Sequence, residues 1–183
     1  MTKWIFEPGH TAAEFRVRHM MVTWVRGHFK NVKGSMEFDP DDPTRSSVRA
    51  VTDATQLWTG EPARDAHLKS PDFLDVAHSP QILFESSLVR QDGANHYRAS
   101  GNVTIRGVAR PVTLEVTYLG QWETPYWEDG VDKGPITRAG FHATTSINRH
   151  DFGVSWNSVL DRGGIVVGDE VFIDIDVEAL KQK

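Results

Sequence analysis

The sequence predicts an all-β protein, an eight-stranded antiparallel barrel with short helical segments capping the ends. Apolar and polar residues alternate with a period of two along most of the chain, which is typical of strands that bury one face. The alternating segments are joined by short turns rich in Gly, Pro and Asp, and helical periodicity is scarce. Because 183 residues suffice for one core, we expect a single domain over residues 1–183.

Eight segments, counted from residue 12, carry this alternation. The first places Ala13, Phe15 and Val17 on one face and Glu14 and Arg16 on the other. An antiparallel meander of eight strands loses both free edges when it closes into a barrel, and its interior is filled by side chains or holds one small ligand. The predicted strands cover residues 12–19, 28–38 with a kink at Gly34, 46–60, 80–89, 96–105, 110–122, 137–149 and 169–180.

Two stretches, 61–80 and 151–169, interrupt the alternation. Their apolar residues follow neither a strand period nor a long helical one. We expect each to form a short helix or turn that lies across an end of the barrel.

The composition excludes several classes of function. A net charge of −5 argues against a protein that binds nucleic acid through the phosphate backbone. The chain has no cysteine, which excludes disulfides, thiolate zinc sites and a cysteine nucleophile. The eight histidines show no metal-ligand spacing, and the signatures of a nucleophilic serine or a phosphate-binding loop are missing, so we expect no metal and no cofactor.

Two predicted strands end their apolar face in an ionisable side chain. The face of Phe15 and Val17 ends in His19, and the face of Ile147 ends in Arg149. Burial of such a group without partners is costly, so we expect each one at the mouth of a cavity or in hydrogen bonds. A cavity with apolar walls and few polar groups is typical of ligand sites. The alternation alone favours the other interpretation, in which these residues are structural and close a filled core.

Several stretches together resemble the YceI-like, polyisoprenoid-binding family. They have unusual composition, occur in the family's order and extend from about Trp4 to Glu178, nearly the whole chain. The resemblance implies a lipocalin-like barrel with an elongated apolar channel for a long lipid tail, and this tips the choice from a filled core to a ligand channel. The stretches are HTAAEFRVRHMMVTWVRGHFKNVKGSMEFDP, RDAHLKSPDFLDVAHSPQILFES, GNVTIRGVARPVTLEV, INRHDFGVSWN and VVGDEVFIDIDVE.

The resemblance also implies candidate ligand-binding residues. The family's motif histidines fall on His10, His19 and His67, and its Arg-x-Asp-Phe-Gly element falls on residues 149–153. We expect His19, His67 and Arg149 to form the polar end of the channel. The complete set of candidates is Phe15, Val17, His19, Phe29, Phe38, His67, Phe73, Phe84, Phe141, Ile147, Arg149 and Trp156.

The resulting hypothesis is a protein that binds a long-chain amphiphilic lipid, namely a polyisoprenoid, an isoprenoid quinone or a fatty amide, as a carrier, store or sequestering protein. The alternative is an enzyme of the isomerase or cyclase type that uses the same cavity, with His19 as general base. A third interpretation is a structural protein for which lipid is only a folding accessory.

The resemblance also suggests a homodimer. The N-terminus shows no secretory pattern, and no apolar run is long enough to cross a bilayer. We therefore expect a cytoplasmic protein that meets its ligand inside the cell or at the inner face of the membrane.

Overall fold

The computed structural model describes residues 1–39 and 41–182. Within these residues, ten strands form one antiparallel sheet. The strands are β1 (Thr2–Phe6), β2 (Ala12–His19), β3 (Thr23–Lys30), β4 (Lys33–Phe38), β5 (Ser47–Asp53), β6 (Gln81–Gln91), β7 (His96–Ile105), β8 (Val108–Glu128), β9 (Val131–Asn148) and β10 (Val167–Lys181).

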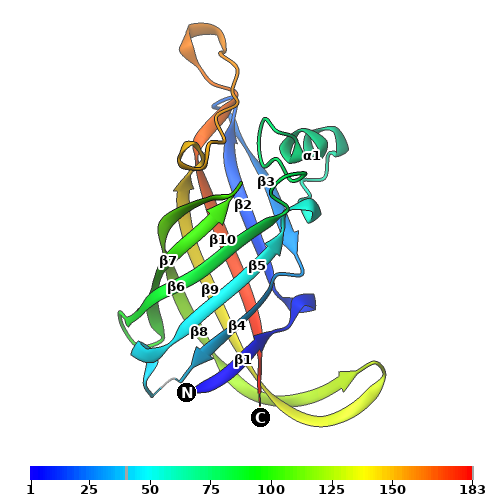
Figure 1. The fold of residues 1–183 in the computed structure, drawn as a ribbon, viewed down its shortest axis with the longest axis vertical. Coiled ribbons are helices and arrows are strands. Elements are labelled where there is room, and N and C mark those ends of the chain that lie inside the picture. The colour runs from blue at the N-terminus through cyan, green and yellow to red at the C-terminus, as the bar shows by residue number, and fades with distance from the viewer. Residues whose placement is uncertain (40, 183) are drawn as a thin grey trace.

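The sheet closes on itself as a barrel with eight strand positions (Figure 1). One edge of β10 pairs with β9, and the other pairs first with β2 and then, nearer the C-terminus, with β1. A 3-10 turn at Pro8–His10 separates β1 from β2, so these two strands share one position. In the same way β3 pairs with β2 and β4 pairs with β1. The predicted eight-stranded antiparallel barrel is confirmed.

The break between β3 and β4 lies at Asn31, not at Gly34 as the sequence predicted. Asn31 has a φ of 58°, a left-handed conformation that asparagine tolerates better than most residues. Gly34 is needed for another reason, because a Cβ there would lie 2.6 Å from the carbonyl oxygen of Arg49 on β5 and 2.7 Å from the ring of Phe6. The glycine therefore allows Phe6 to pack close to β4.

The helical segments cover mainly the end of the barrel that lies opposite the two termini (Figure 1). Helix α1 (Pro62–Lys69) and the turns η4 (Arg149–Phe152) and η5 (Asp161–Gly163) belong to the two stretches that interrupt the alternation. Further 3-10 turns are η1 (Pro8–His10), η2 (Pro43–Arg45) and η3 (Ala54–Gln56). The predicted short helical caps are therefore present.

Helix α1 is fastened to the segment that follows β5. The carboxylate of Asp65, which is almost buried, accepts hydrogen bonds from Thr59 N at 2.9 Å and Thr59 Oγ1 at 2.5 Å. Arg64 donates to the same hydroxyl and to Thr59 O. These contacts fix the helix over one end of the barrel.

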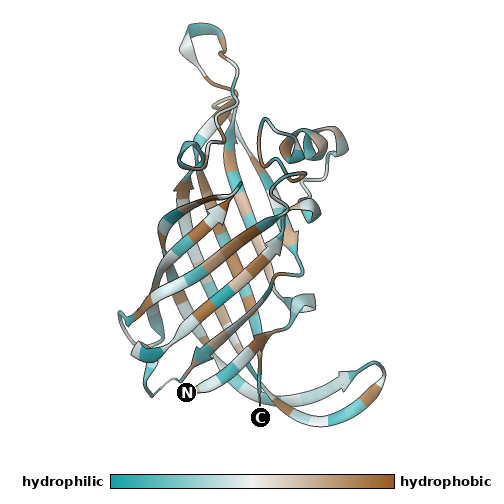
Figure 2. Ribbon diagram, viewed as in Figure 1, coloured by the Kyte–Doolittle hydropathy of each residue, from teal (hydrophilic) through white to brown (hydrophobic). Residues whose placement is uncertain are grey.

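The buried side chains gather at the two ends of the barrel and leave its middle less densely filled. At the end near the termini, Trp4, Phe6 and Phe38 belong to the largest buried cluster. Beneath the helical segments, Phe73 and Phe152 belong to a second cluster. Apolar and polar residues alternate along the strands between these clusters (Figure 2).

Strands β8 and β9 extend beyond the barrel as a two-stranded arm, the yellow-green and yellow hairpin in Figure 1. The β7 ladder on β8 starts from Thr117, and the β10 ladder on β9 ends at Arg138. The arm carries exposed apolar side chains, among them Trp122, Trp127 and Val131.

Candidate functional site

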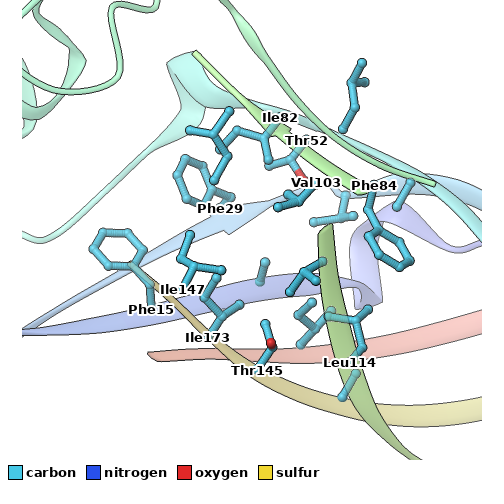
Figure 3. A pocket seen from close by; sticks show the side chains of 18 of the residues that line it. Phe15, Phe29, Thr52, Ile82, Phe84, Val103, Leu114, Thr145, Ile147 and Ile173 are labelled. Carbon is cyan, nitrogen blue, oxygen red and sulfur yellow. The ribbon is translucent and has the colours of Figure 1, made fainter. Parts of the chain in front are cut away.

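The barrel encloses an elongated cavity of about 300 Å³. This volume is at the lower end of the range of about 300–1,000 Å³ that is usual for ligand pockets. Its wall is almost entirely apolar and is formed mainly by inward-facing residues of the ten strands β1–β10 (Figure 3). The interior of the barrel is therefore partly hollow.

Several inward-facing side chains keep accessible surface because they face this cavity. Phe15 and Val17 on β2, Phe84 on β6 and Ile173 on β10 line the cavity, and none of them is fully buried. A Cβ at Gly27 would collide with the Phe15 ring, so this glycine lets the ring lie against β3. In a filled core these large apolar side chains would be fully buried.

An aromatic cluster closes the cavity near the termini. The ring centroid of Phe38 lies 5.1 Å from Phe141, 5.2 Å from Tyr118 and 5.9 Å from Tyr97. Burial raises the pKa of the Tyr97 and Tyr118 hydroxyls above the ordinary value of about 10. This end offers a ligand mainly apolar surface, with the phenol of Tyr97 and the hydroxyl of Ser46 as neutral polar groups.

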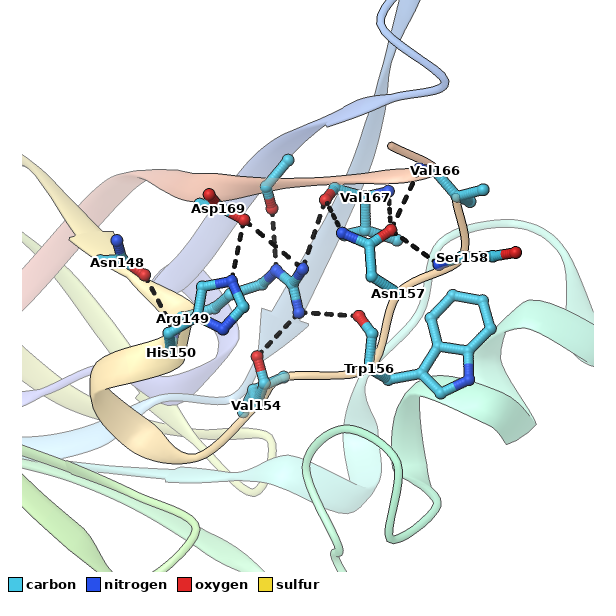
Figure 4. A network of polar contacts seen from close by, with 11 residues as sticks. Asn148, Arg149, His150, Val154, Trp156, Asn157, Ser158, Val166, Val167 and Asp169 are labelled. Atoms are coloured by element: carbon cyan, nitrogen blue, oxygen red, sulfur yellow. Dashed lines mark hydrogen bonds and ion pairs between the residues drawn. The ribbon is translucent and has the colours of Figure 1, made fainter. Parts of the chain in front are cut away.

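Arg149 lies at the opposite end and is only 4% exposed (Figure 4). Its guanidinium donates to Val154 O at 2.7 Å and to the carbonyl oxygens of Trp156 and Gly168 at 2.9 Å. A longer bond of 3.3 Å reaches Val167 O. Because these carbonyls belong to the segment after η4 and to the start of β10, Arg149 holds the two segments together.

Burial lowers the pKa of the Arg149 guanidinium below its ordinary value, and Asp169 at 3.7 Å partly opposes the shift. Arginine remains charged at neutral pH even so. The cation is buried with most of its N–H donors engaged, which leaves little capacity for a ligand head group.

His67 and His19 do not line the cavity. The Nε2 atom of His67 lies 2.9 Å from the carboxylate of Asp72, and its ring packs edge-on against Phe73 and Trp156. His19 pairs with Thr23 and Val167 in the sheet. The position of His19 therefore gives no support to the alternative of a general base.

Nine of the twelve candidate residues line the cavity and three do not. His67, Trp156 and Phe73 form one aromatic group, and Phe73 extends from it into the cavity wall. Contact with a ligand stays a prediction for all twelve. Those in the wall are Phe15, Val17, Phe29, Phe38, Phe73, Phe84, Phe141, Ile147 and Arg149.

The candidate set omitted much of the wall. The aromatic residues Phe6, Tyr97 and Phe152 were missed. Most of the missing residues, however, are aliphatic or small and come from the long strands, and the side chains of several are visible in Figure 3. Most of them alternate along their strands with residues that face outward. This alternation is the sequence signal that identifies them as inward-facing. They include Thr52, Ile82, Val103, Leu114, Thr145, Val171, Ile173 and Ile175.

Across residues 1–39 and 41–182, His, Asp and Glu side chains form no group of three suited to holding a metal ion. In the same part of the chain, no helix has the length and apolar character to span a membrane.

The family model described as "YceI-like domain" matches residues 4–179. The chain belongs to this family. A UPF0312 protein of Enterobacter sp. strain 638 is 36% identical over 177 residues, which are 97% of this chain and 84% of that protein. Protein YceI of Escherichia coli O157:H7 is 34% identical over 177 residues, 97% of this chain and 85% of that protein.

Solved structures share the barrel. The crystal structure of BcnA from Burkholderia cenocepacia superposes with a TM-score of 0.74 at 24% identity and covers 92% of this chain and 95% of that one. A polyisoprenoid binding domain from Saccharophagus degradans, described as implicated in plant cell wall breakdown, gives a TM-score of 0.66 at 12% identity and covers 98% of both chains. At these identities the likeness shows a common fold.

Proposed function

We propose that this YceI-like protein binds one amphiphilic lipid with a long apolar tail, a polyisoprenoid, an isoprenoid quinone or a fatty amide, in the channel of its barrel. The observation that carries the proposal is the apolar cavity of about 300 Å³ inside a closed barrel. The similar fold of the polyisoprenoid binding domain from Saccharophagus degradans supports the same class of ligand.

The tail supplies the affinity in this proposal. Each methylene that leaves water contributes about 0.8 kcal/mol, so a five-carbon unit contributes about 4 kcal/mol. The tail lies between the aromatic cluster of Phe38 and the end that Arg149 supports. The polar head group lies toward the Arg149 end, because the other end is closed by aromatic rings.

The biological role in this proposal is to carry, store or sequester the lipid. A closed apolar cavity hides the tail from water, which is what each of these roles requires. The protein is expected to act in the cytoplasm and to meet its ligand at the inner face of the membrane. A homodimer is part of the proposal, and the exposed Trp122 and Trp127 of the β8–β9 arm are the surface that supports it.

The test is mass spectrometry of an organic extract from natively purified protein, compared for two variants on neighbouring positions of β9. Thr145 lines the cavity, whereas Ser146 is exposed. Thr145→Phe fills the channel and is expected to reduce the extracted lipid at least tenfold, and Ser146→Phe is expected to leave the amount unchanged. Absence of lipid from the unchanged protein, or equal loss in both variants, contradicts the proposal.

A further inference from the structure

Two loops form a projecting tip at the end of the barrel opposite the termini (Figure 1). We use the word tip for residues 20–22, which join β2 to β3, and residues 157–166, which precede β10. The backbone N–H of Met20 donates to Val166 O at 2.7 Å, which ties the two loops together. The next residue, Val167, lines the cavity. The tip therefore adjoins one end of the channel.

The tip exposes large apolar side chains. Met20 is 44% exposed, Met21 55%, Val22 79% and Val159 80%. Three of these residues are consecutive, and the fourth lies on the second loop of the same tip. Exposed apolar side chains gathered on projecting loops are unfavourable in water and are typical of contact sites.

The backbone of the β2–β3 turn disfavours the residues that it carries. Met20 and Met21 have φ values of 48° and 61°, and Val22 N donates to His19 O at 3.1 Å across the turn. Two successive left-handed residues are typical of a type I′ turn, where Asn-Gly is preferred and bulky apolar residues are disfavoured. Two methionines at these positions are unfavourable both for the turn backbone and for contact with water. Folding therefore does not explain them, which indicates a function of the exposed side chains.

The charge around the tip is opposite to that of the whole chain. Residues 16–26 and 157–172, where β2 and β10 pair, contain four arginines and three acidic residues, a local net charge of +1, whereas the chain has a net charge of −5. Arg18, Arg26 and Arg162 make no ion pair with any described residue. Arg18 stacks over the ring of Trp24 at 4.8 Å. Arginine beside an aromatic ring and exposed aliphatic side chains is typical of the interface of an anionic membrane.

We propose that the tip docks on the surface of a bilayer that contains anionic lipid. The four exposed apolar side chains insert among the head groups, and the arginines contact lipid phosphates. This surface is distinct from the channel that binds the tail of a ligand. Since docking places one end of the channel against the bilayer, it also sets the direction in which a lipid enters or leaves.

The test is co-sedimentation of the full-length protein with vesicles of phosphatidylcholine that contain about 30 mol % phosphatidylglycerol, compared with pure phosphatidylcholine. Met20→Asn/Met21→Gly suits the turn better and removes the apolar side chains, so it is expected to keep or raise the Tm and to weaken binding about tenfold or more. Arg162→Gln is expected to weaken binding about fivefold and to reduce its dependence on salt.

The matched control is Leu88→Asn on β6, because Leu88 is 42% exposed and lies outside the tip. This variant is expected to bind vesicles as the unchanged protein does. Failure of the unchanged protein to bind anionic vesicles overturns the proposal, and so does an equal loss of binding in Leu88→Asn. The channel-filled variant Thr145→Phe is expected to bind vesicles normally, so the failure of docking is distinguishable from the failure of the proposed lipid site.

Discussion

Replacement of Phe38 by alanine tests whether the aromatic cluster sets the length of the bound tail. Phe38 lines the cavity, and its ring contacts Phe141, Tyr118 and Tyr97 with centroids 5.1 to 5.9 Å away. Removal of the ring extends the channel by space for about one five-carbon unit, because the lost group is itself six carbons in size. The preferred tail is therefore expected to lengthen by that unit.

The magnitude follows from two opposing terms. An empty cavity after Phe→Ala destabilises a protein by about 3–5 kcal/mol. A tail that fills the new space recovers about 0.8 kcal/mol per methylene, or about 4 kcal/mol for five carbons. The lipid-free variant is thus expected to lose most of this stability, and the variant loaded with the longer lipid is expected to regain it.

The assay is displacement of a fluorescent lipid by prenyl alcohols of increasing length, together with urea denaturation of the free and loaded forms. The control is Phe172→Ala, because Phe172 is outside the cavity wall and packs edge-on against Trp24. This control removes the same atoms without opening the channel. An unchanged length optimum in Phe38→Ala, or an equal shift in Phe172→Ala, refutes the reasoning.

Three further predictions concern the supports of the site. Arg149→Leu leaves the carbonyls of the 154–156 segment unpaired and is expected to cost about 3–5 kcal/mol in urea denaturation; if stability is unchanged and only head-group preference moves, the structural role is wrong. The pKa of Tyr97 is raised by burial, so the unfolded chain loses its phenolic proton first and stability is expected to fall above a pH of about 10. Tyr97→Phe is expected to flatten this decline, and a Tm profile that is identical in both proteins contradicts the argument. Asp65→Asn weakens both hydrogen bonds from Thr59 and is expected to cost about 1–3 kcal/mol and to speed amide exchange in α1, whereas unchanged exchange contradicts the fastening role.

The strand pattern sufficed to predict the barrel, because a strand with one apolar face must bury it and eight such strands close without edges. The break between β3 and β4 was misplaced for a local reason. Asn31 adopts a left-handed backbone, whereas Gly34 makes room for Phe6, and a single sequence does not distinguish these two uses of a small or polar residue. Pairing of both β1 and β2 with β10 is equally invisible locally, since it depends on contacts at least 148 residues apart in the chain.

The sequence predicted the positions of most of the aromatic wall residues but not the partners of the ionisable residues. Inward aromatics such as Phe15 and Phe84 follow from parity, so their positions in the cavity wall were accessible to sequence reasoning. Arg149 donates its hydrogen bonds to backbone carbonyl groups rather than to a ligand. Every residue has such a carbonyl group, so no sequence pattern predicts which of them Arg149 will bind. His67 is similar, because its partner Asp72 is five residues away on a turn whose geometry the sequence does not specify.

The tip and the channel each carry an energetic cost, and the two costs differ in kind. This difference allows the two proposals to be tested separately. A hollow barrel sacrifices packing contacts that a filled core would make, so a ligand tail that supplies them stabilises the protein. In the Met20–Met21 turn, the left-handed backbone is unfavourable for methionine, and the exposed side chains are unfavourable in water. A ligand within the channel changes neither of these two costs. Lipid in the cavity therefore changes the free energy of unfolding, whereas lipid beneath the tip changes the free energy of membrane binding. Loading the channel should raise the Tm without changing vesicle affinity, and a loss of docking when the channel is filled would show that the two sites are one.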